Sequence, residues 1–305
     1  MIILLYLIIL LSIILAMAFF TLLERKILGY IQLRKGPNKV AIGGLPQPLA
    51  DALKLLSKEW MKPIRASQGL FLLMPMCLLL ISILSWAIVP FYYSIFFYKM
   101  TFLMFLMFMS LMVYPSLLSG WLSNSKYASI GALRSVAQTI SYEICMALLL
   151  ICPLSLIITF GANELLFSQK NMWACFMMPM IVTMWWVTLM AEANRTPFDL
   201  IEGESELVSG FNVEYGSIGF TLIFMAEYLS ILLMSLITSM LFIGGIGVFG
   251  NEVMMFKTLL ISASFIYIRG TLPRIRYDTL MTISWADLLP ISIIYLLVVL
   301  LCSEL

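Results

Sequence analysis

The chain is divided into apolar runs of roughly 20 residues, the length that an α-helix needs to cross the hydrocarbon core of a bilayer. An outer-membrane β-barrel would instead show alternating strands of about ten residues. Hydrophobic residues make up 62% of the 305 residues and charged residues only 11%, which leaves too little polar surface to coat a water-soluble domain. The sequence therefore predicts an all-α polytopic membrane protein.

We expect a single integral membrane domain over residues 1–305, with about eight transmembrane helices. The first apolar run is kept as a span because it lacks the basic segment and cleavage site of a signal peptide. Residues 47–60 carry leucines on one helical face and charges on the other, so an amphipathic interfacial helix is expected there, either as a surface anchor or as part of a functional site. The predicted spans are 2–23, 69–90, 100–122, 136–160, 172–191, 217–243, 253–268 and 285–302.

Positive charge is distributed unevenly between the two sides that these spans define. Eight spans place both termini on one side and the connections 24–67, 123–135, 191–216 and 269–284 on the other. Of the 18 Lys and Arg residues, only Lys99, Lys170 and Lys257 lie outside these four connections. Cationic loops stay on the inner face of a membrane, so the four connections are predicted to lie inside.

The connection 191–216 is an acidic segment opposed by a single base, Arg195. Pro197 interrupts a helix there, and acids spaced two residues apart cannot share one helical face. We interpret it as a folded loop whose carboxylates converge and which faces the basic connection 24–67; the alternative is a solvated loop that docks on a soluble partner. Its acids are Glu192, Asp199, Glu202, Glu204, Glu206 and Glu214.

Two carboxylates fall inside predicted spans, each beside a tyrosine: Glu143 follows Tyr142, and Glu227 precedes Tyr228. An intramembrane carboxylate costs several kcal/mol unless it is protonated or paired, so both are candidates for proton transfer. The alternative is a neutral glutamate that hydrogen-bonds neighbouring helices together.

The chain contains no histidine, and its five cysteines have no paired spacing. His-ligated haem, copper and zinc are therefore excluded, and we expect no metal site. Proton chemistry must rest on carboxylates, tyrosine or lysine. No nucleic-acid partner is expected.

Several motifs follow one another along nearly the whole chain. They are Glu24-Arg25-Lys26, 34–38, 138–143, 197–200, 202–212, 226–228 and 273–278. In this order they resemble the subunit 1 family of NADH:ubiquinone oxidoreductase, respiratory complex I. The small size and high methionine content resemble its mitochondrially encoded members.

The resemblance implies a subunit that binds no redox cofactor, with NADH, FMN and iron–sulfur clusters on other subunits. It implies ubiquinone as substrate, other complex I subunits and membrane lipids as partners, and a multi-pass place in the mitochondrial inner membrane with the charged loops on the matrix side and both termini toward the intermembrane space. The implied quinone channel comprises Arg25, Arg34, Arg134, Arg195, Phe198, Asp199, Glu202, Glu204, Glu206 and Arg274. The implied proton path comprises Glu24, Tyr142, Glu143, Glu192, Glu214, Glu227 and Tyr228.

Two other functions remain open at this point. A stand-alone ion transporter would also carry carboxylates between its helices. A structural anchor for a peripheral arm would also need charged loops on one face.

Overall fold

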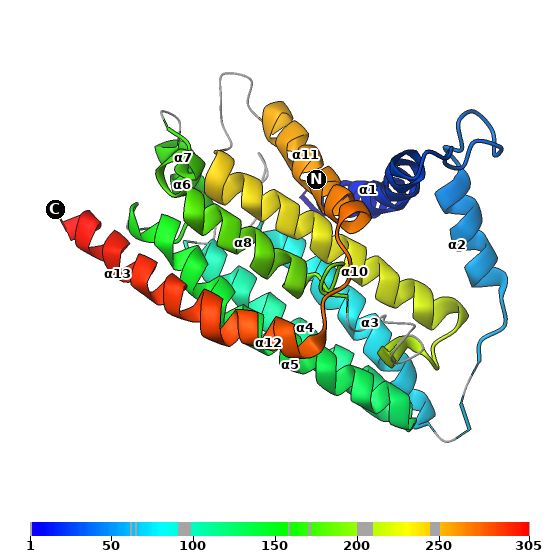
Figure 1. Cartoon of the computed structure of the whole chain (residues 1–305). Coiled ribbons are helices and arrows are strands. Elements are labelled where there is room, and N and C mark those ends of the chain that lie inside the picture. The colour runs from blue at the N-terminus through cyan, green and yellow to red at the C-terminus, as the bar shows by residue number, and fades with distance from the viewer. Residues whose placement is uncertain are drawn as a thin grey trace.

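The computed structural model in Figure 1 describes residues 2–61, 63–64, 66–90, 99–157, 159–169, 172–199, 210–244 and 251–304. Within these ranges the secondary structure is helical and no strand occurs. Short 3₁₀ or π turns are η1 (Trp86–Ile88), η2 (Gly210–Asn212), η3 (Ser239–Ile243) and η4 (Ile283–Leu288). The α-helices are α1 (Ile2–Ile31), α2 (Gln47–Ser57), α3 (Gln68–Ser85), α4 (Thr101–Leu122), α5 (Lys126–Ser155), α6 (Ala162–Ser168), α7 (Ala174–Met177), α8 (Pro179–Glu192), α10 (Ser217–Thr238), α11 (Asn251–Thr271), α12 (Tyr277–Thr282) and α13 (Leu289–Glu304).

Seven helical stretches in the described part of the chain are long and apolar enough to cross a membrane. This confirms the predicted all-α polytopic class. The predicted span 172–191 is divided between α7 and α8, because Met178 leaves the helical conformation and Pro179, which lacks an N–H, begins α8. Since α8 has only 14 residues, the number of eight spans stays a prediction.

Several helices continue beyond the apolar runs that predicted them. α1 runs to Ile31 and so includes Glu24 and Arg25, which were assigned to a connection. α5 begins at Lys126, and α12, η4 and α13 follow one another from Tyr277 without an extended segment. Charged residues end an apolar run without ending a helix, since their long stems can reach polar surroundings. The interfacial helix ends earlier than predicted, at Ser57.

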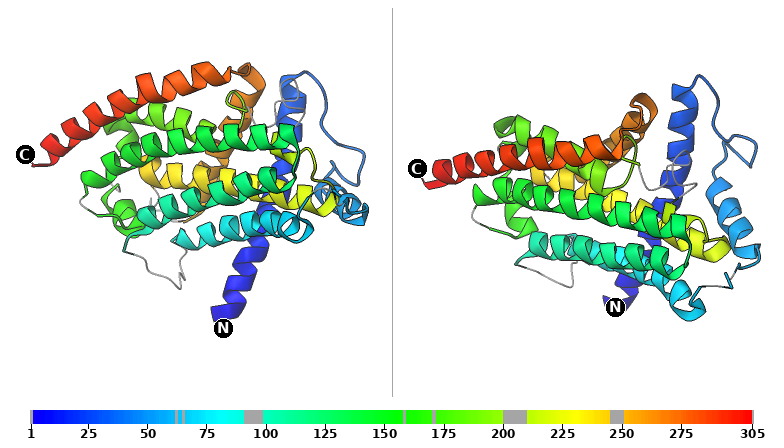
Figure 2. Two further views of the ribbon diagram at one scale, coloured as in Figure 1. Left: turned by 90° about the horizontal axis from the view of Figure 1, so that it is seen from below. Right: turned by 60° about the horizontal axis from the view of Figure 1, so that its bottom comes forward.

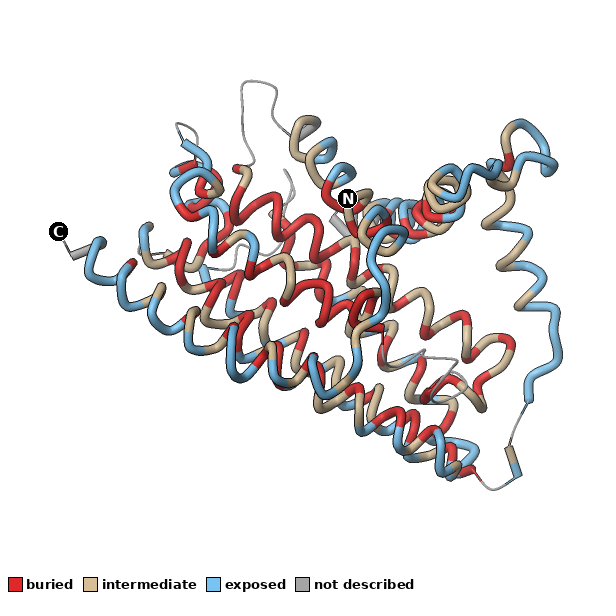
Figure 3. Tube along the Cα trace, in the orientation of Figure 1, coloured by how far each residue is buried: buried red, intermediate tan, exposed pale blue. Residues whose placement is uncertain are grey.

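The helices form a bundle in which α3, α4, α5, α8, α10 and α13 lie side by side, while α1 crosses the others and α2 stands at the periphery (Figures 1 and 2). Burial is concentrated along α5, α8 and α10, as the red stretches of Figure 3 show. Fully buried residues there include Leu149, Trp185 and Leu233. These three helices therefore form the core that positions the site.

The acidic segment returns to the bundle through η2 and Tyr215. A Cβ atom on Gly131 of α5 would lie 2.8 Å from the Cα of Gly210, so the two backbones approach each other too closely for a side chain. The Tyr215 ring stacks on Phe71 of α3 at 4.1 Å between centroids, and its hydroxyl donates to the Phe71 carbonyl at 3.1 Å. Burial raises the pKa of the Tyr215 phenol, so it remains a hydrogen-bond donor. These contacts anchor the C-terminal end of the segment.

Candidate functional site

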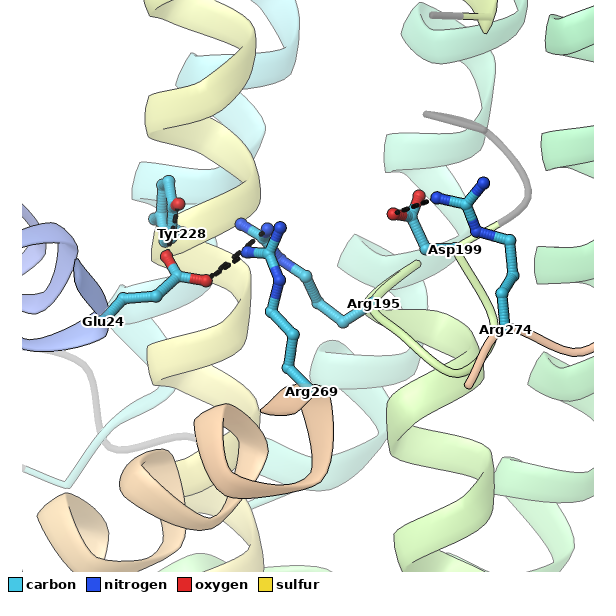
Figure 4. A network of polar contacts seen from close by, with 6 residues as sticks. All are labelled: Glu24, Arg195, Asp199, Tyr228, Arg269 and Arg274. Atoms are coloured by element: carbon cyan, nitrogen blue, oxygen red, sulfur yellow. Dashed lines mark hydrogen bonds and ion pairs between the residues drawn. The ribbon is translucent and has the colours of Figure 1, made fainter. Parts of the chain in front are cut away.

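Glu24 of α1 is a carboxylate that the fold buries among cationic and phenolic groups, as Figure 4 shows. Only 6% of its surface is exposed. The Tyr228 hydroxyl of α10 donates a 2.6 Å hydrogen bond to its Oε2, and Arg269 of α11 forms an ion pair with its Oε1. Arg195 Nη1 lies 4.0 Å from the same Oε1. A buried carboxylate is costly unless it is paired, and these three groups provide the pairing.

Arg195 connects the acidic segment to this network. It follows α8, and its backbone N–H donates to the Met190 carbonyl at 3.3 Å. Its guanidinium lies 4.6 Å from the centre of the Tyr228 ring, within the range of a cation–π contact. The structure thus brings together three predicted residues, Glu24, Arg195 and Tyr228, from distant parts of the sequence.

A second ion pair joins the acidic segment to the residues that follow α11. Arg274 Nη2 lies 3.5 Å from Asp199 Oδ2, and the Ile275 N–H donates to the Pro197 carbonyl at 3.0 Å. Asp199 is 5% exposed, so this contact is largely screened from solvent. The predicted residues Asp199 and Arg274 therefore act as a pair.

Gln138 of α5 holds the same segment from the bundle side. Its buried Nε2 donates to the carbonyls of Ala191 at 2.8 Å and Phe198 at 3.0 Å. The Phe198 ring lies 6.0 Å from the Tyr142 ring, and the Tyr142 hydroxyl donates to the Leu280 carbonyl at 3.0 Å. Tyr142, predicted to belong to the proton path, thus uses its hydroxyl to join α5 to α12.

A cleft of about 470 Å³ lies between α1, α2, α10 and α11. Two ion pairs line it, Glu24 with Arg269 and Arg25 with Asp51, and Gln47 Nε2 donates to Asp51 Oδ1 at 2.9 Å. Most of the remaining lining residues are apolar. They are Met17, Ala18, Leu28, Pro48, Ala52, Leu55, Phe220, Phe224 and Met225.

Aromatic residues on α10 form a row along this cleft. Phe220 and Phe224 lie 4.3 Å apart between ring centroids, and Phe224 and Tyr228 lie 6.4 Å apart. Their spacing of four residues places them on one helical face. The row leads from apolar rings to the Tyr228 hydroxyl and hence to the carboxylate of Glu24.

A second, smaller cavity of about 80 Å³ contains the predicted acids Glu192 and Glu227. Glu192 is 7% exposed, and its Oε2 has no hydrogen-bond partner among the described residues. The cavity exceeds the volume of one water and carries polar groups that could bind it. Its other polar lining residues are Ser116, Ser135, Thr139, Asn194 and Ser230.

The cleft and the small cavity lie on two sides of α10. Tyr228 lines the cleft, whereas the preceding residue, Glu227, lines the cavity. The same division occurs at the end of α8, where its last residue, Glu192, lines the cavity and the following Arg195 approaches Glu24 beside the cleft. One helix and one short segment therefore separate a ligand-sized space from a space that contains carboxylates.

The other predicted site residues are placed separately from the Glu24 network. Arg34 is exposed and bonds to Gln32; the guanidinium of Arg134 lies 6.0 Å from the centre of the Tyr277 ring. Glu143 and Glu214 are half-buried. Three further acids lie outside the described residues, so their place in a charged chamber stays a prediction: Glu202, Glu204 and Glu206.

Three residues of the site were not predicted as site residues: Asp51, Gln138 and Arg269. Asp51 was assigned to the polar face of an interfacial helix, yet it turns toward Arg25 and the cleft. Arg269 and Glu24 are 245 residues apart, and spacing along the chain carries no signal for such a pair. Among the described residues, no group of three or more His, Cys, Asp or Glu side chains could hold a metal ion.

These features define an all-α, multi-pass membrane protein with an amphipathic cleft and buried carboxylates. Residues 4–300 match the family model described as NADH dehydrogenase. The chain is 48% identical to the NADH-ubiquinone oxidoreductase chain 1 of Aedes aegypti, over 92% of this chain and 88% of the relative. It is 47% identical to that of Locusta migratoria and 46% identical to that of Emballonura alecto, with at least 92% of each chain covered. The chain belongs to the NADH dehydrogenase family.

Proposed function

We propose that this chain is a membrane-arm subunit of NADH:ubiquinone oxidoreductase, which admits ubiquinone from the bilayer and begins the path that couples its reduction to proton translocation. The proposal rests on one observation, the amphipathic cleft that lies back to back with the carboxylate-lined cavity across α10. The family membership and the names of the relatives support it.

The cleft suits a quinone with an isoprenoid tail. A volume of about 470 Å³ falls within the roughly 300–1,000 Å³ of small-molecule sites. The apolar lining and the aromatic row on α10 offer a surface for the tail. Arg25 and Arg269 offer hydrogen-bond donors to the carbonyl oxygens of the head group.

The reduction of ubiquinone to ubiquinol takes up two electrons and two protons. We assign the electron donors, NADH, FMN and iron–sulfur clusters, to other subunits, and we expect this chain to be inactive by itself. Its own residues contribute a route for the quinone and groups that can respond to the charge of the reduced head. Arg34, Arg134, Phe198, Asp199 and Arg274, with the undescribed Glu202, Glu204 and Glu206, complete the proposed channel.

Charge at the quinone can reach the cavity through the Glu24 network. A negative charge near Arg269 or Arg195 competes with Glu24 for the same cations, and this changes the hydrogen bond from Tyr228. Glu227 is next to Tyr228 on α10, and Glu192 is close to Arg195 in sequence. A rearrangement of Tyr228 or Arg195 therefore alters the electrostatic surroundings of the two cavity acids. We propose that protons then pass among Glu192, Glu227, Glu143 and Glu214.

Partners and location follow from the same proposal. The partners are the other subunits of the complex, ubiquinone and membrane lipids. We place the chain in the mitochondrial inner membrane, with the charged connections facing the matrix and both termini facing the intermembrane space.

The proposal is tested by photo-crosslinking native membranes with a light-activated ubiquinone analogue and mapping the labelled peptides, with ordinary ubiquinone as competitor. Label on α1, α2 or α10 that disappears under competition is the expected result. If a quinone site on another subunit is labelled and this chain is not, the cleft is not a quinone route, and the anchor or transporter functions are favoured instead.

A further inference from the structure

Lys257 of α11 makes a set of contacts at the end of α10 that Figure 1 shows beside α6 and α7. Its Nζ donates hydrogen bonds to the carbonyls of Ile243 at 3.0 Å and Gly244 at 2.9 Å. The same ammonium lies 4.6 Å from the centre of the Trp173 ring, within cation–π range. One side chain of α11 thus joins the end of η3 to the residue that precedes α7.

The carbonyls at this helix end need such partners. The last carbonyls of a helix have no donor within the helix, and they carry the negative end of its dipole. Gln169 supplies a second donor, with its Nε2 2.6 Å from the Leu241 carbonyl. Gly244 ends the helix at a φ of 64°, in the left-handed region that favours glycine. A lysine ammonium therefore stabilises this end both by charge and by hydrogen bonds.

A lysine near the end of a membrane span more commonly extends its stem toward water and the lipid head groups. The observed contacts differ from that arrangement, because the Lys257 ammonium bonds to backbone carbonyls of a neighbouring element. Its role is therefore to fix α11 to η3, and not only to place a charge at the interface.

A second polar contact fixes the other end of the same helix. Arg269, which pairs with Glu24 beside the cleft, follows Lys257 by twelve residues, or about 18 Å along a helix. Between them, Leu259 and Leu260 are exposed on the apolar outer side of α11. Lipid tails are as apolar as such side chains, so apolar contacts distinguish poorly between neighbouring axial positions of a helix in a bilayer. The polar contacts at its two ends decide that position.

We propose that Lys257 is a positioning residue for the cleft. By fixing α11 axially at η3, it sets where Arg269 meets Glu24 and Tyr228. This inference rests on the proposed quinone function, because its main readout is the use of ubiquinone.

The test compares three variants of the chain, each assembled in its native membranes. Lys257→Met keeps the length of the side chain and removes its charge and donors, whereas Lys257→Arg keeps both. Lys99→Met removes an exposed lysine that precedes α4 as a control. We expect Lys257→Met to raise the KM for ubiquinone roughly fivefold, at the low end of coupling between sites, with kcat nearly unchanged. Lys257→Arg should restore the KM, and Lys99→Met should leave it unaltered.

A double-mutant cycle shows whether Lys257 acts through Arg269. In an Arg269→Lys background, Lys257→Met should change the KM much less than it does in the unsubstituted chain, because the group being positioned has already been altered. Equal fold-changes in both backgrounds, a failure of Lys257→Arg to restore the KM, or the same change in Lys99→Met would each overturn the inference.

Trp173→Leu covers the case in which Lys257→Met does not assemble. It removes the aromatic face of the contact and keeps the lysine, so it should raise the KM for ubiquinone by a smaller factor than Lys257→Met. An unchanged KM contradicts the inference. Photo-labelling of the unsubstituted chain separates the two proposals. If the cleft is labelled but the Lys257 variants behave normally, only the positioning role is wrong. If the cleft is never labelled, the quinone function fails and the positioning role fails with it.

Discussion

Glu24 and Glu192 are buried to the same degree, with 6% and 7% of their surfaces exposed, yet their surroundings differ. Glu24 is held by a tyrosine hydroxyl and two arginines. Glu192 Oε2 has no hydrogen-bond partner in the described part of the chain, and the side chain borders a cavity that can hold water. Burial alone therefore does not define the surroundings of a carboxylate: Glu24 is held by three partners, whereas Glu192 borders a space that can hold water.

The largest effect is expected from Glu24→Gln. An amide cannot balance Arg269 and Arg195, and breaking a buried ion pair costs about 3–5 kcal/mol. The amount of assembled complex should fall severalfold, and the ubiquinone reductase activity of the remainder should fall by more than about tenfold. Native gels and NADH:ubiquinone assays on the same membranes measure both quantities.

Glu164→Gln is the matched control, because Glu164 is exposed on α6, away from the cleft. It should leave assembly and activity unchanged. Normal assembly and activity in Glu24→Gln would show that its ion pairs are dispensable and would remove the contrast with Glu192.

Glu192→Gln should have the second-largest effect and a different pattern. The amide has nearly the same shape, so assembly should be retained. It cannot carry a proton between neighbouring groups, and proton-coupled turnover should fall about tenfold, which corresponds to about 1.4 kcal/mol of barrier. Proton uptake by sealed vesicles during NADH oxidation measures this loss.

Glu192→Asp keeps the titratable group and should recover part of the proton uptake. Oxidation of NADH by a hydrophilic artificial acceptor should be normal in both variants, because it does not use the quinone cleft. Unimpaired proton uptake in Glu192→Gln would show that the cavity acid is not a proton carrier.

The fold class could be predicted because its cause is local. Apolar runs of bilayer length specify helices one by one, and the all-α polytopic class follows from them. The ends of the helices were predicted less well. Charged residues such as Glu24 end an apolar run, but the helix α1 continues past them to Ile31. Met178 and Pro179 interrupt a run that composition shows as continuous.

The site could be predicted only as separate residues. Motif resemblance supplied Glu24, Arg195 and Tyr228, but their mutual contacts depend on how α1, α8 and α10 cross. Asp51 was missed because a charge opposite an apolar helical face is usually a solvated residue. Arg269 was missed because it was assigned to the connection 269–284, and its partner Glu24 is 245 residues away in sequence. The crossing of α1 with α2 and α11 turns both charges into the cleft.

Tyr228→Phe tests how much of the Glu24 network depends on the hydroxyl alone. The ring and its cation–π contact with Arg195 remain, whereas one hydrogen bond to a carboxylate is lost. Such bonds contribute about 1.5–3 kcal/mol, and the two arginines compensate for part of that, so ubiquinone turnover should fall roughly three- to fivefold with normal assembly. Steady-state kinetics at saturating ubiquinone measures it, and a loss as large as that of Glu24→Gln would contradict the sharing of the carboxylate among three partners.

Asp51→Asn should have the smallest effect, since it alters the more exposed ion pair of the cleft. The side chains of Arg25 and Asp51 are 53% and 31% exposed, and exposed pairs contribute about 0.2–1 kcal/mol. The KM for ubiquinone should rise about two- to threefold while kcat and assembly are preserved. Titration of the rate with ubiquinone in the same membranes checks the change.

Salt distinguishes this pair from the buried one. Screening weakens exposed charges much more than buried ones, so added salt should raise the KM of the unsubstituted chain toward that of Asp51→Asn and leave the variant nearly unaffected. Lys54→Gln, which removes an exposed charge from the same helix α2, should keep the salt response of the unsubstituted chain. If the KM still responds to salt in Asp51→Asn, the response comes from other charges. The Arg25–Asp51 pair would then be only a packing contact between α1 and α2.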